Sequence, residues 1–335
     1  MTESDRRPGA RRPSTLHDVA ERVGVSARTV SRVVNDEGGF SETTRRRVLD
    51  AVADLAYRPN VHARQLISGR SGSIGFLAPT LSDPFFPELA EGVQRAARAA
   101  GLMVLLSMSN GDGATQTDVL TELEGHHLQG VVVFPVGPLD ELVPFLDRGM
   151  RMVTVDTVVD HPNAAAVLAD LEGGTRSAVD HLVRRGCRHL AMISHGDEPT
   201  DRRRRANAFL EALPDDVEHT VLDVDATMAG GRRAAETIIE LHPDVDGVFT
   251  YNDMMAIGAM QVLQTAGRSI PDDIAIIGCD DIQVAAGVLP PLSTIRIDPI
   301  LLGGEAVQLL HELEAGARPR GPRRLPARLV LRQSA

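Results

Sequence analysis

Residues 18–35 read Asp-Val-Ala-Glu-Arg-Val-Gly-Val-Ser-Ala-Arg-Thr-Val-Ser-Arg-Val-Val-Asn, and this stretch decides how the first part of the chain folds. Apolar residues recur at helical spacing on both sides of Gly24, which predicts two short helices joined by a tight turn. Ala20, Gly24 and Val30 supply the small packing residue, the turn and the apolar anchor that a helix-turn-helix requires. As a bare pattern, an ordinary helical hairpin with capped ends remains an alternative.

The flanking residues complete a unit of three short helices. Thr15 and Asp18 have the spacing of a capping box, and serines stand at the N-caps of the second and third helices. We therefore predict a helix-turn-helix domain at residues 15–59. Residues 1–14 contain four arginines and two prolines but cannot form a core, so they are predicted to be a flexible basic arm.

A helix-turn-helix inserts its second helix into the major groove of DNA, which assigns roles to the side chains of residues 26–35. Ala27, Arg28 and Arg32 are expected to face the bases, since arginine can bind guanine with two hydrogen bonds and alanine can contact a thymine methyl. Short polar side chains suit phosphate oxygens, and those expected to do so are Ser26, Thr29, Ser31, Asn35, Ser41 and Thr44. Leu16 and His17, at the start of the first helix, complete the predicted DNA-binding set.

After residue 72 the chain alternates between apolar runs and amphipathic helical patterns such as Glu88–Ala100 and Gly173–Arg185. Runs that are apolar throughout and separated by helices indicate buried parallel strands in an α/β fold. There are too many such units for one sheet, so two lobes with parallel sheets are predicted. The runs are Ile74–Pro79, Leu102–Ser107, Val131–Phe134, Met152–Val155, Leu190–Ile193, Gly247–Tyr251 and Ile274–Ile277.

Composition excludes several classes of protein. The 335 residues are 43% hydrophobic, as in a globular protein, and no apolar run approaches the ~18–20 residues that span a bilayer. The basic N-terminus lacks the apolar segment of a secretory signal, and two cysteines exclude a disulfide framework, so the cytoplasm is the expected location. No spacing typical of metal ligands, of a phosphate-binding loop or of a catalytic nucleophile is present, so we expect no metal, cofactor or catalytic site.

The charge is distributed unevenly. The chain has a formal charge of −11, which by itself argues against a nucleic-acid partner. Residues 1–70, however, contain 13 arginines and nine acidic residues, whereas residues 71–335 contain 22 arginines and 37 acidic residues. Residues 1–70, which we call the head, therefore carry a net positive charge, and the lobes carry a net negative charge. This distribution predicts that the head faces DNA.

The helix-turn-helix stretch at 15–35, followed by Arg58-Pro59-Asn60, resembles the opening of the LacI/GalR (lactose-repressor) family of bacterial transcription regulators. The resemblance continues in order along nearly the whole chain. Its further motifs are Ile74-Gly75-Phe76, Asp83-Pro84-Phe85-Phe86, Tyr251-Asn252-Asp253-Met254-Met255-Ala256, Ile277-Gly278-Cys279-Asp280-Asp281 and Pro290-Pro291-Leu292-Ser293-Thr294-Ile295.

The resemblance implies how the rest of the chain is organised. Residues 60–72 would form a hinge helix and linker, in which Leu66, with Ala63 beside it, wedges into the minor groove of the operator; packing of Leu66 on the first lobe is the alternative. Residues 73–335 would form a two-lobed domain like that of periplasmic binding proteins, used for ligand binding and dimerisation. The implied lobes are about 73–168 with 299–323, and about 169–298 with 324–335.

Several polar residues follow predicted strands, where open α/β sheets bind ligands. Asp156, Asn252 and Asp280 stand at such positions, and the ligand-contacting positions of the family correspond to these three and to Arg205. Arg205 belongs to a run of four arginines and is selected by its spacing from Phe209, with an error of one position left open. Each of these residues could instead cap a helix or form a turn, and this structural role is the one expected of Asp253 and Asp281.

The ligand itself is not determined by the sequence. Family members that bind sugars often place an aromatic ring near the position of Ala226, so here Phe86 and Phe134 are the candidates for stacking against the ligand. Ile297 replaces a glutamine that is frequent in the family. A simple hexose and a smaller or differently shaped ligand therefore both remain possible.

The resemblance implies a ligand-responsive transcription regulator, most often a repressor, that binds a palindromic operator as a dimer and is controlled by a sugar-like effector between its lobes. The alternatives are a solute-binding protein, against which the helix-turn-helix counts, and an enzyme on the same fold. The identity of the effector, the sign of the response and the target genes are left open.

Overall fold

A computed structural model describes residues 14–34, 38–57, 72–196, 203–317 and 321–335 of the chain. The chain divides into two units, Met1–Arg70 and Ser71–Ala335, and each is described by itself. Of the predicted basic arm only Ser14 is described, and of the predicted hinge only Gly72. Asn35, Ala63 and Leu66 lie outside the described residues.

The first unit contains three helices, α1 (Leu16–Val23), α2 (Ala27–Val34) and α3 (Glu42–Asp54). Thr15 and Asp18 form the predicted capping box, and Gly24 ends α1 in the left-handed conformation. The hydroxyl groups of Ser26 and Ser41 accept hydrogen bonds from the backbone three residues later and so start α2 and α3. The predicted helix-turn-helix head is confirmed.

The core of the head is built from small branched side chains. Val19, Val30 and Val48 are fully buried, one on each helix, and Tyr57 closes the cluster. Because each of the three helices contributes one of these valines, the angle between α1 and α2 depends on packing against α3 as well as on the turn at Gly24.

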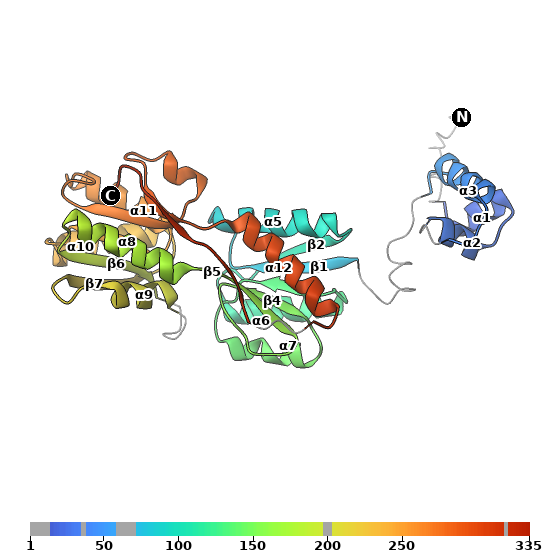
Figure 1. The fold of residues 1–335 in the computed structure, drawn as a ribbon, viewed down its shortest axis with the longest axis horizontal. Helices are drawn as coiled ribbons and strands as arrows, with labels where there is room; N and C mark the ends of the chain where they lie inside the picture. Colours follow the sequence, from blue (N-terminus) through green and yellow to red (C-terminus); the bar gives the residue numbers. More distant parts are fainter. Residues whose placement is uncertain (1–13, 35–37, 58–71, 197–202, 318–320) are drawn as a thin grey trace, which may run out of the picture. The chain divides into compact units, whose positions relative to one another are not determined.

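The second unit contains two six-stranded sheets, each forming one lobe (Figure 1). The first sheet has the order β11-β5-β4-β3-β1-β2 and is parallel throughout. Its strands are β1 (Ser73–Ala78), β2 (Met103–Met108), β3 (Val131–Val133), β4 (Met152–Val155), β5 (Ala164–Ala169) and β11 (Arg323–Leu325). Its helices are α5 (Phe85–Ala99), α6 (Gly113–Gly125), η1 (Leu139–Glu141), α7 (Val143–Asp147) and α12 (Pro299–Glu314).

The second sheet has the order β12-β10-β9-β8-β6-β7, with only the β10–β12 pair antiparallel. Its strands are β6 (His189–His195), β7 (Glu218–Val224), β8 (Gly247–Thr250), β9 (Ala275–Asp280), β10 (Ser293–Arg296) and β12 (Arg328–Val330). Its helices are α8 (Leu171–Arg185), α9 (Arg204–Ala212), α10 (Met228–Leu241), α11 (Asp253–Thr265) and η3 (Gln283–Ala286). The predicted α/β fold with two lobes and parallel sheets is confirmed.

The chain passes between the two sheets three times, after β5, after β10 and after β11 (Figure 1). The last passage follows Leu325, two residues later than the boundary expected at 323, because β11 stays paired with β5 through Leu325. In the described ranges, no helix is both long enough and apolar enough to cross a membrane.

Each of the seven apolar runs falls on a strand, but five strands were not predicted as such. β5 is mostly alanine and has a single β-branched residue, Val167, of the kind that marks a strand. β7 lies at the edge of its sheet and mixes polar with apolar residues, while β10, β11 and β12 are only three or four residues long. The two predicted helices begin earlier than expected, at Phe85 and Leu171.

Glycines allow helices to touch closely in both lobes. A Cβ atom added at Gly231 of α10 would overlap the carbonyl oxygen of Met255 in α11, and one added at Gly258 of α11 would overlap that of Met228 in α10. In the first lobe, a Cβ atom at Gly92 of α5 would overlap the start of α12. The α10–α11 pair is therefore held together through its backbones at two places.

Candidate functional site

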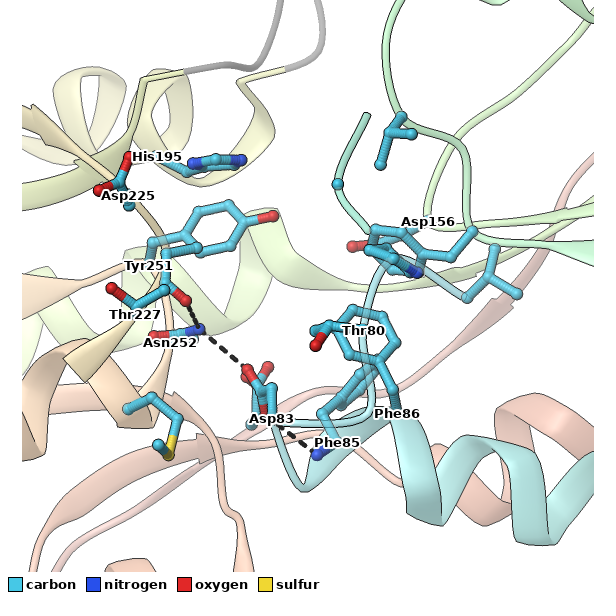
Figure 2. A pocket seen from close by; sticks show the side chains of 18 of the residues that line it. Thr80, Asp83, Phe85, Phe86, Asp156, His195, Asp225, Thr227, Tyr251 and Asn252 are labelled. Atoms are coloured by element: carbon cyan, nitrogen blue, oxygen red, sulfur yellow. Dashed lines mark hydrogen bonds between the residues drawn. The ribbon is translucent and has the colours of Figure 1, made fainter. Parts of the chain in front are cut away.

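A cavity of about 580 Å³ lies between the two lobes of the second unit. It is bounded by the loops at the carboxyl ends of strands from both sheets, which is where open α/β sheets place ligands. Figure 2 shows two groups of side chains facing one another, Thr80, Phe86 and Asp156 from the first lobe and His195, Thr227 and Tyr251 from the second.

The structure brings all six candidate ligand-binding residues to this cavity, although they come from segments spread over almost 200 positions of the chain. The residues are Phe86, Phe134, Asp156, Arg205, Asn252 and Asp280. Ala226, the position where an aromatic ring was considered, also lines the cavity. Ile297 is instead part of the buried core.

The first-lobe side of the cavity is largely aromatic. Phe85, Phe86 and Phe134 pack edge to face, with ring centroids 5.3 Å apart for Phe85 and Phe86 and 5.1 Å apart for Phe86 and Phe134. Edge-to-face packing fixes ring orientations, so the cluster presents a preformed apolar surface. We call Phe85, Phe86 and Phe134 the aromatic wall.

Asp83 and Asn252 connect the two sides of the cavity (Figure 2). Asn252 caps α11, since its Oδ1 accepts from the backbone of Met255 at 2.9 Å, while its Nδ2 donates to Asp83 Oδ2 at 3.0 Å and to the carbonyl of Ala226 at 3.3 Å. Asp83 Oδ1 also accepts from the backbone of Phe85 at 3.0 Å. Asn252 thus has both of the roles considered for it, capping a helix and lining the cavity.

Arg205 is the most enclosed cation of the cavity, being only 7% exposed. Its Nη2 lies 3.7 Å from Asp280 Oδ1 and 3.9 Å from Asp156 Oδ2, and its guanidinium carbon lies 4.2 Å from the centre of the Tyr251 ring. These separations give charge compensation but exceed hydrogen-bonding distances. Within the described part of the chain, the buried Nε of Arg205 has no hydrogen-bond partner.

Arg204 also lines the cavity, so selecting Arg205 alone from the arginine run was incomplete. The Arg204 side chain donates to Asp156 Oδ1, to both oxygens of Glu172 and to the carbonyl of Ala169, each at 2.7 Å. Asp156 and Ala169 belong to the first lobe and Glu172 to the second. Arg204 therefore joins the lobes, a role that depends on tertiary contacts and leaves no local signal.

Asp280 and Asp156 both adopt positive φ angles, of 115° and 64°. Such angles are unfavourable for residues other than glycine, and they concentrate at functional sites where surrounding contacts maintain them. Asp280 is the last residue of β9 and is buried. Burial raises the pKa of Asp280, and the nearby Arg205 charge opposes that rise. Burial likewise raises the pKa of Asp83.

The two aspartates expected to be structural do not line the cavity. Asp253 is completely buried and accepts hydrogen bonds from Thr294 Oγ1 at 2.5 Å and from the backbone of Ile282 at 2.9 Å. Burial raises its pKa to about 7. Asp281 forms ion pairs with Arg296 and Arg332, each at 2.5 Å.

Sequence reasoning missed several residues of the cavity, including His195, Asp225, Thr227 and Tyr251. His195 ends β6 and Tyr251 directly follows β8, so the strand-end argument that selected Asn252 would also have found these two. Tyr251 was instead taken as the last residue of an apolar run. Among the described residues, no group of three or more histidine, cysteine, aspartate or glutamate side chains is placed to hold a metal ion.

In the head, the predicted DNA-binding residues occupy the start of α1, the length of α2 and the start of α3. The side chains of His17, Ser26, Arg28 and Ser41 are exposed. Arg32 is half-buried and donates to the carbonyl of Gly38. Ser26 and Ser41 are also bonded to Thr29 and Thr44, each at 2.9 Å, as part of their capping arrangement.

Known proteins show the same order of a helix-turn-helix head and a two-lobed domain. Residues 15–60 match the family model for bacterial regulatory proteins of the lacI family, and residues 179–335 match that of a periplasmic binding protein-like domain. The ribose operon repressor of Halalkalibacterium halodurans is 31% identical over 327 residues, which cover 96% of this chain and 97% of the relative.

Solved structures share this fold over nearly the whole chain. The lac repressor dimer bound to operator and an anti-inducer superposes with a TM-score of 0.89 at 27% identity, covering 96% of this chain and 99% of that one. A complex of the transcriptional regulator CelR with cellobiose superposes with a TM-score of 0.73 at 29% identity, covering 96% and 100% of the two chains.

A helix-turn-helix head followed by two lobes that enclose a cavity with polar and aromatic sides defines the class of ligand-responsive transcription regulators. The chain belongs to the lacI family of bacterial regulatory proteins, which confirms the resemblance found in its sequence.

Proposed function

We propose that this protein is a repressor that binds a palindromic operator as a dimer and responds to a small polar effector held between its lobes. It acts in the cytoplasm by binding alone, without catalysis. The observation that carries the proposal is the cavity itself, to which the second lobe brings Arg205 from α9 and Asn252 and Asp280 from strand ends, opposite the aromatic wall of the first lobe. The ribose and lac repressors among its relatives support the assignment of a repressor.

In this proposal the six candidate residues divide the recognition of the effector between them. Asp280 accepts hydrogen bonds from hydroxyl groups, and the amide of Asn252 can accept from them or donate to them. Arg205 adds donors in a fixed geometry. Phe86 and Phe134 cover an apolar face of the effector, while Asp156 holds both arginines in place.

The response follows from contacts that cross the cavity. Asp83 bonds to Asn252 and Asp156 bonds to Arg204, and each pair joins the two lobes. An effector that binds between these pairs favours one arrangement of the lobes by as much as its affinities for the two arrangements differ. By reciprocity, the factor by which the effector changes the affinity of the dimer for operator DNA equals the factor by which the operator changes its affinity for the effector.

The head supplies sequence recognition in this proposal. Arg28 and Arg32 read base edges, Ala27 contacts a thymine methyl, and the short polar side chains of α2 and α3 position the head on phosphates. Leu66, with Ala63, wedges into the minor groove at the centre of the operator. Two symmetry-related heads require a palindromic site.

The test is a gel-shift titration with palindromic operators selected from randomised DNA, repeated at several salt concentrations. We expect Arg28→Ala to weaken binding by roughly 1–3 kcal/mol and to relax the preference at one base pair in each half-site, because a bidentate contact is lost. Arg95→Ala, which removes the same charge from an exposed side chain of α5 in the second unit, is the control and leaves binding unchanged. Absence of salt-dependent binding at low salt would reject the proposal and favour a solute-binding protein.

A further inference from the structure

Residues 331–335, which we call the tail, follow β12 and pack against the second lobe. Ser334 is completely buried, and its hydroxyl donates to the carbonyl of Ile276 at 2.6 Å and accepts from the backbone of Ser293 at 2.8 Å. The carbonyl oxygen of Ser334 also accepts from the backbone of Ile276 at 2.7 Å. Because Ile276 lies in β9 and Ser293 begins β10, Ser334 fixes the tail to both strands.

Arg332 belongs to the tail and reaches the turn that follows β9. Its backbone donates to Ser293 Oγ at 2.9 Å, its Nη1 to the carbonyl of Leu292 at 2.6 Å and its Nη2 to Asp281 Oδ1 at 2.5 Å. The side chain of Arg332 is 18% exposed and that of Asp281 is 5% exposed, so water screens this ion pair little. An arginine that is anchored at its backbone and at a second carbonyl holds the carboxylate beside it in a fixed place.

The turn that follows β9 requires such support. Asp280 and Asp281 have φ angles of 115° and 59°, and residues with such angles persist only where the surrounding contacts maintain them. Arg205 lies 3.7 Å from the Asp280 carboxylate, which exceeds hydrogen-bonding distance. The Asp281 carboxylate, by contrast, accepts from Arg296 and Arg332, each at 2.5 Å. The shorter polar contacts at this turn are therefore made by the aspartate outside the cavity.

We propose that Arg332 is a positioning residue, which holds Asp280 in the cavity by fixing Asp281 from outside it. The inference rests on the proposed effector-binding function for the use made of Asp280, but the positioning itself is measured without an effector. Arg332 contributes more than Arg296, since the Arg296 side chain is 58% exposed and water screens its ion pair. Loss of Arg332 therefore releases residues 279–281 while the rest of the lobe stays folded.

Two buried cysteines of the second lobe separate this local release from unfolding of the whole lobe. Cys279 directly precedes Asp280, and Cys187 lies just before β6. Burial raises the pKa of both thiols, so both are expected to react slowly in the folded chain. The experiment labels the full chain with N-ethylmaleimide and measures the labelling rate of each cysteine by mass spectrometry of proteolytic fragments.

We expect Arg332→Gln to raise the labelling rate of Cys279 at least about tenfold and to change that of Cys187 less than about twofold, because only the turn after β9 opens. Arg296→Gln is the matched control on the same carboxylate and is expected to change the rate at Cys279 less than about twofold. In an Asp281→Asn chain, Arg332→Gln is expected to have no further effect, since the carboxylate through which Arg332 acts is absent.

Arg332→Lys keeps a cation near Asp281 but loses the forked contact with Leu292, so its labelling rate at Cys279 is expected to lie between those of wild type and Arg332→Gln. Circular dichroism and thermal unfolding establish which variants are folded, and Arg332→Lys replaces Arg332→Gln in the comparison if the latter does not fold.

Four results overturn the inference. They are a wild-type labelling rate at Cys279 when Arg332 is replaced, equal acceleration at Cys279 and Cys187, equal effects of Arg332→Gln and Arg296→Gln, and an undiminished effect of Arg332→Gln in the Asp281→Asn chain. Operator binding is measured separately by gel shift, so any of these results leaves the proposed repressor function standing.

Discussion

The two sides of the cavity are built on different physical principles. On the first lobe, three phenylalanines pack against each other and need no partner beyond the core behind them. On the second lobe, Arg205 lies against Asp280 through charge and against Tyr251 through a cation–π contact. Asn252 of the same lobe bonds across the cavity to Asp83. Loss of one ring from the first side leaves no buried charge unpaired, whereas loss of Arg205 from the second side does.

Because of this contrast, substitutions on the two sides are expected to affect ligand affinity and folding stability to different degrees. Substitutions in the aromatic wall are expected to change affinity more than stability, and substitutions in the charged group are expected to change both. A comparison of the two properties in the same variants therefore shows which side a residue belongs to.

The largest expected effect is that of Arg205→Met. Removing the guanidinium leaves Asp280 buried without its compensating cation, so we expect the free energy of unfolding to fall by about 3–5 kcal/mol. Denaturant titration measures it. Arg233→Met is the matched control, since it breaks an exposed pair with Asp225 and is expected to cost at most about 1 kcal/mol. Equal losses in the two variants would show that the stability of the second lobe does not depend on the buried charge of Arg205.

The next effect concerns pH and the second lobe. The pKa of Asp253 is about 7 in the folded chain and close to 4 when unfolded, so the folded state binds more protons between these values. Stability is therefore expected to fall as pH rises from about 4 to 7 and to level off above pH 7, with Asp253 contributing at most about 4 kcal/mol. Burial raises the pKa of Asp280 as well, which adds to the same slope.

Unfolding free energies measured across this pH range test the assignment. Asp253→Asn is expected to flatten the slope, since it removes the titrating group, whereas Asp244→Asn, an exposed position of the same lobe, leaves it unchanged. An Asp253→Asn variant with the original slope would place the pH dependence elsewhere.

The smallest effect is expected from the aromatic wall. Phe134→Ala removes a half-buried ring that faces the cavity, and we expect about a tenfold weaker affinity for the effector, or about 1.4 kcal/mol. Calorimetry with a ligand found to bind the wild-type chain measures the change. Leu81→Ala serves as the control, because Leu81 is partly exposed and does not line the cavity. An unchanged affinity in Phe134→Ala would remove the aromatic wall from the binding site.

Features that depend on neighbours in sequence could be predicted well. The caps at Thr15, Ser26 and Ser41 use backbone groups three residues away, so the pattern alone contains the information. The buried strands of parallel sheets were equally clear because their apolar runs are continuous. β5 and β7 were missed because neither a run of alanines nor a mixture of polar and apolar residues gives such a signal.

The sequence predicted where the cavity lies, but it did not predict the hydrogen bonds that join its residues. The strand-end rule located Asp156, Asn252 and Asp280, because the position of a residue after a strand is a local property. The bond between Asp83 and Asn252 joins residues 169 positions apart, and the partners of Arg204 come from both lobes. Such pairs depend on how the lobes meet, which periodicity and composition do not encode.

The glycine contacts between α10 and α11 have a mechanical consequence. Thr227 caps α10 and Asn252 caps α11, and both caps line the cavity. Because Gly231 and Gly258 bring the two helix backbones into contact, neither helix can slide or tilt without the other. A molecule that pulls on either cap therefore moves both helices together. A larger residue at Gly231 would push the two helices apart and uncouple their movements.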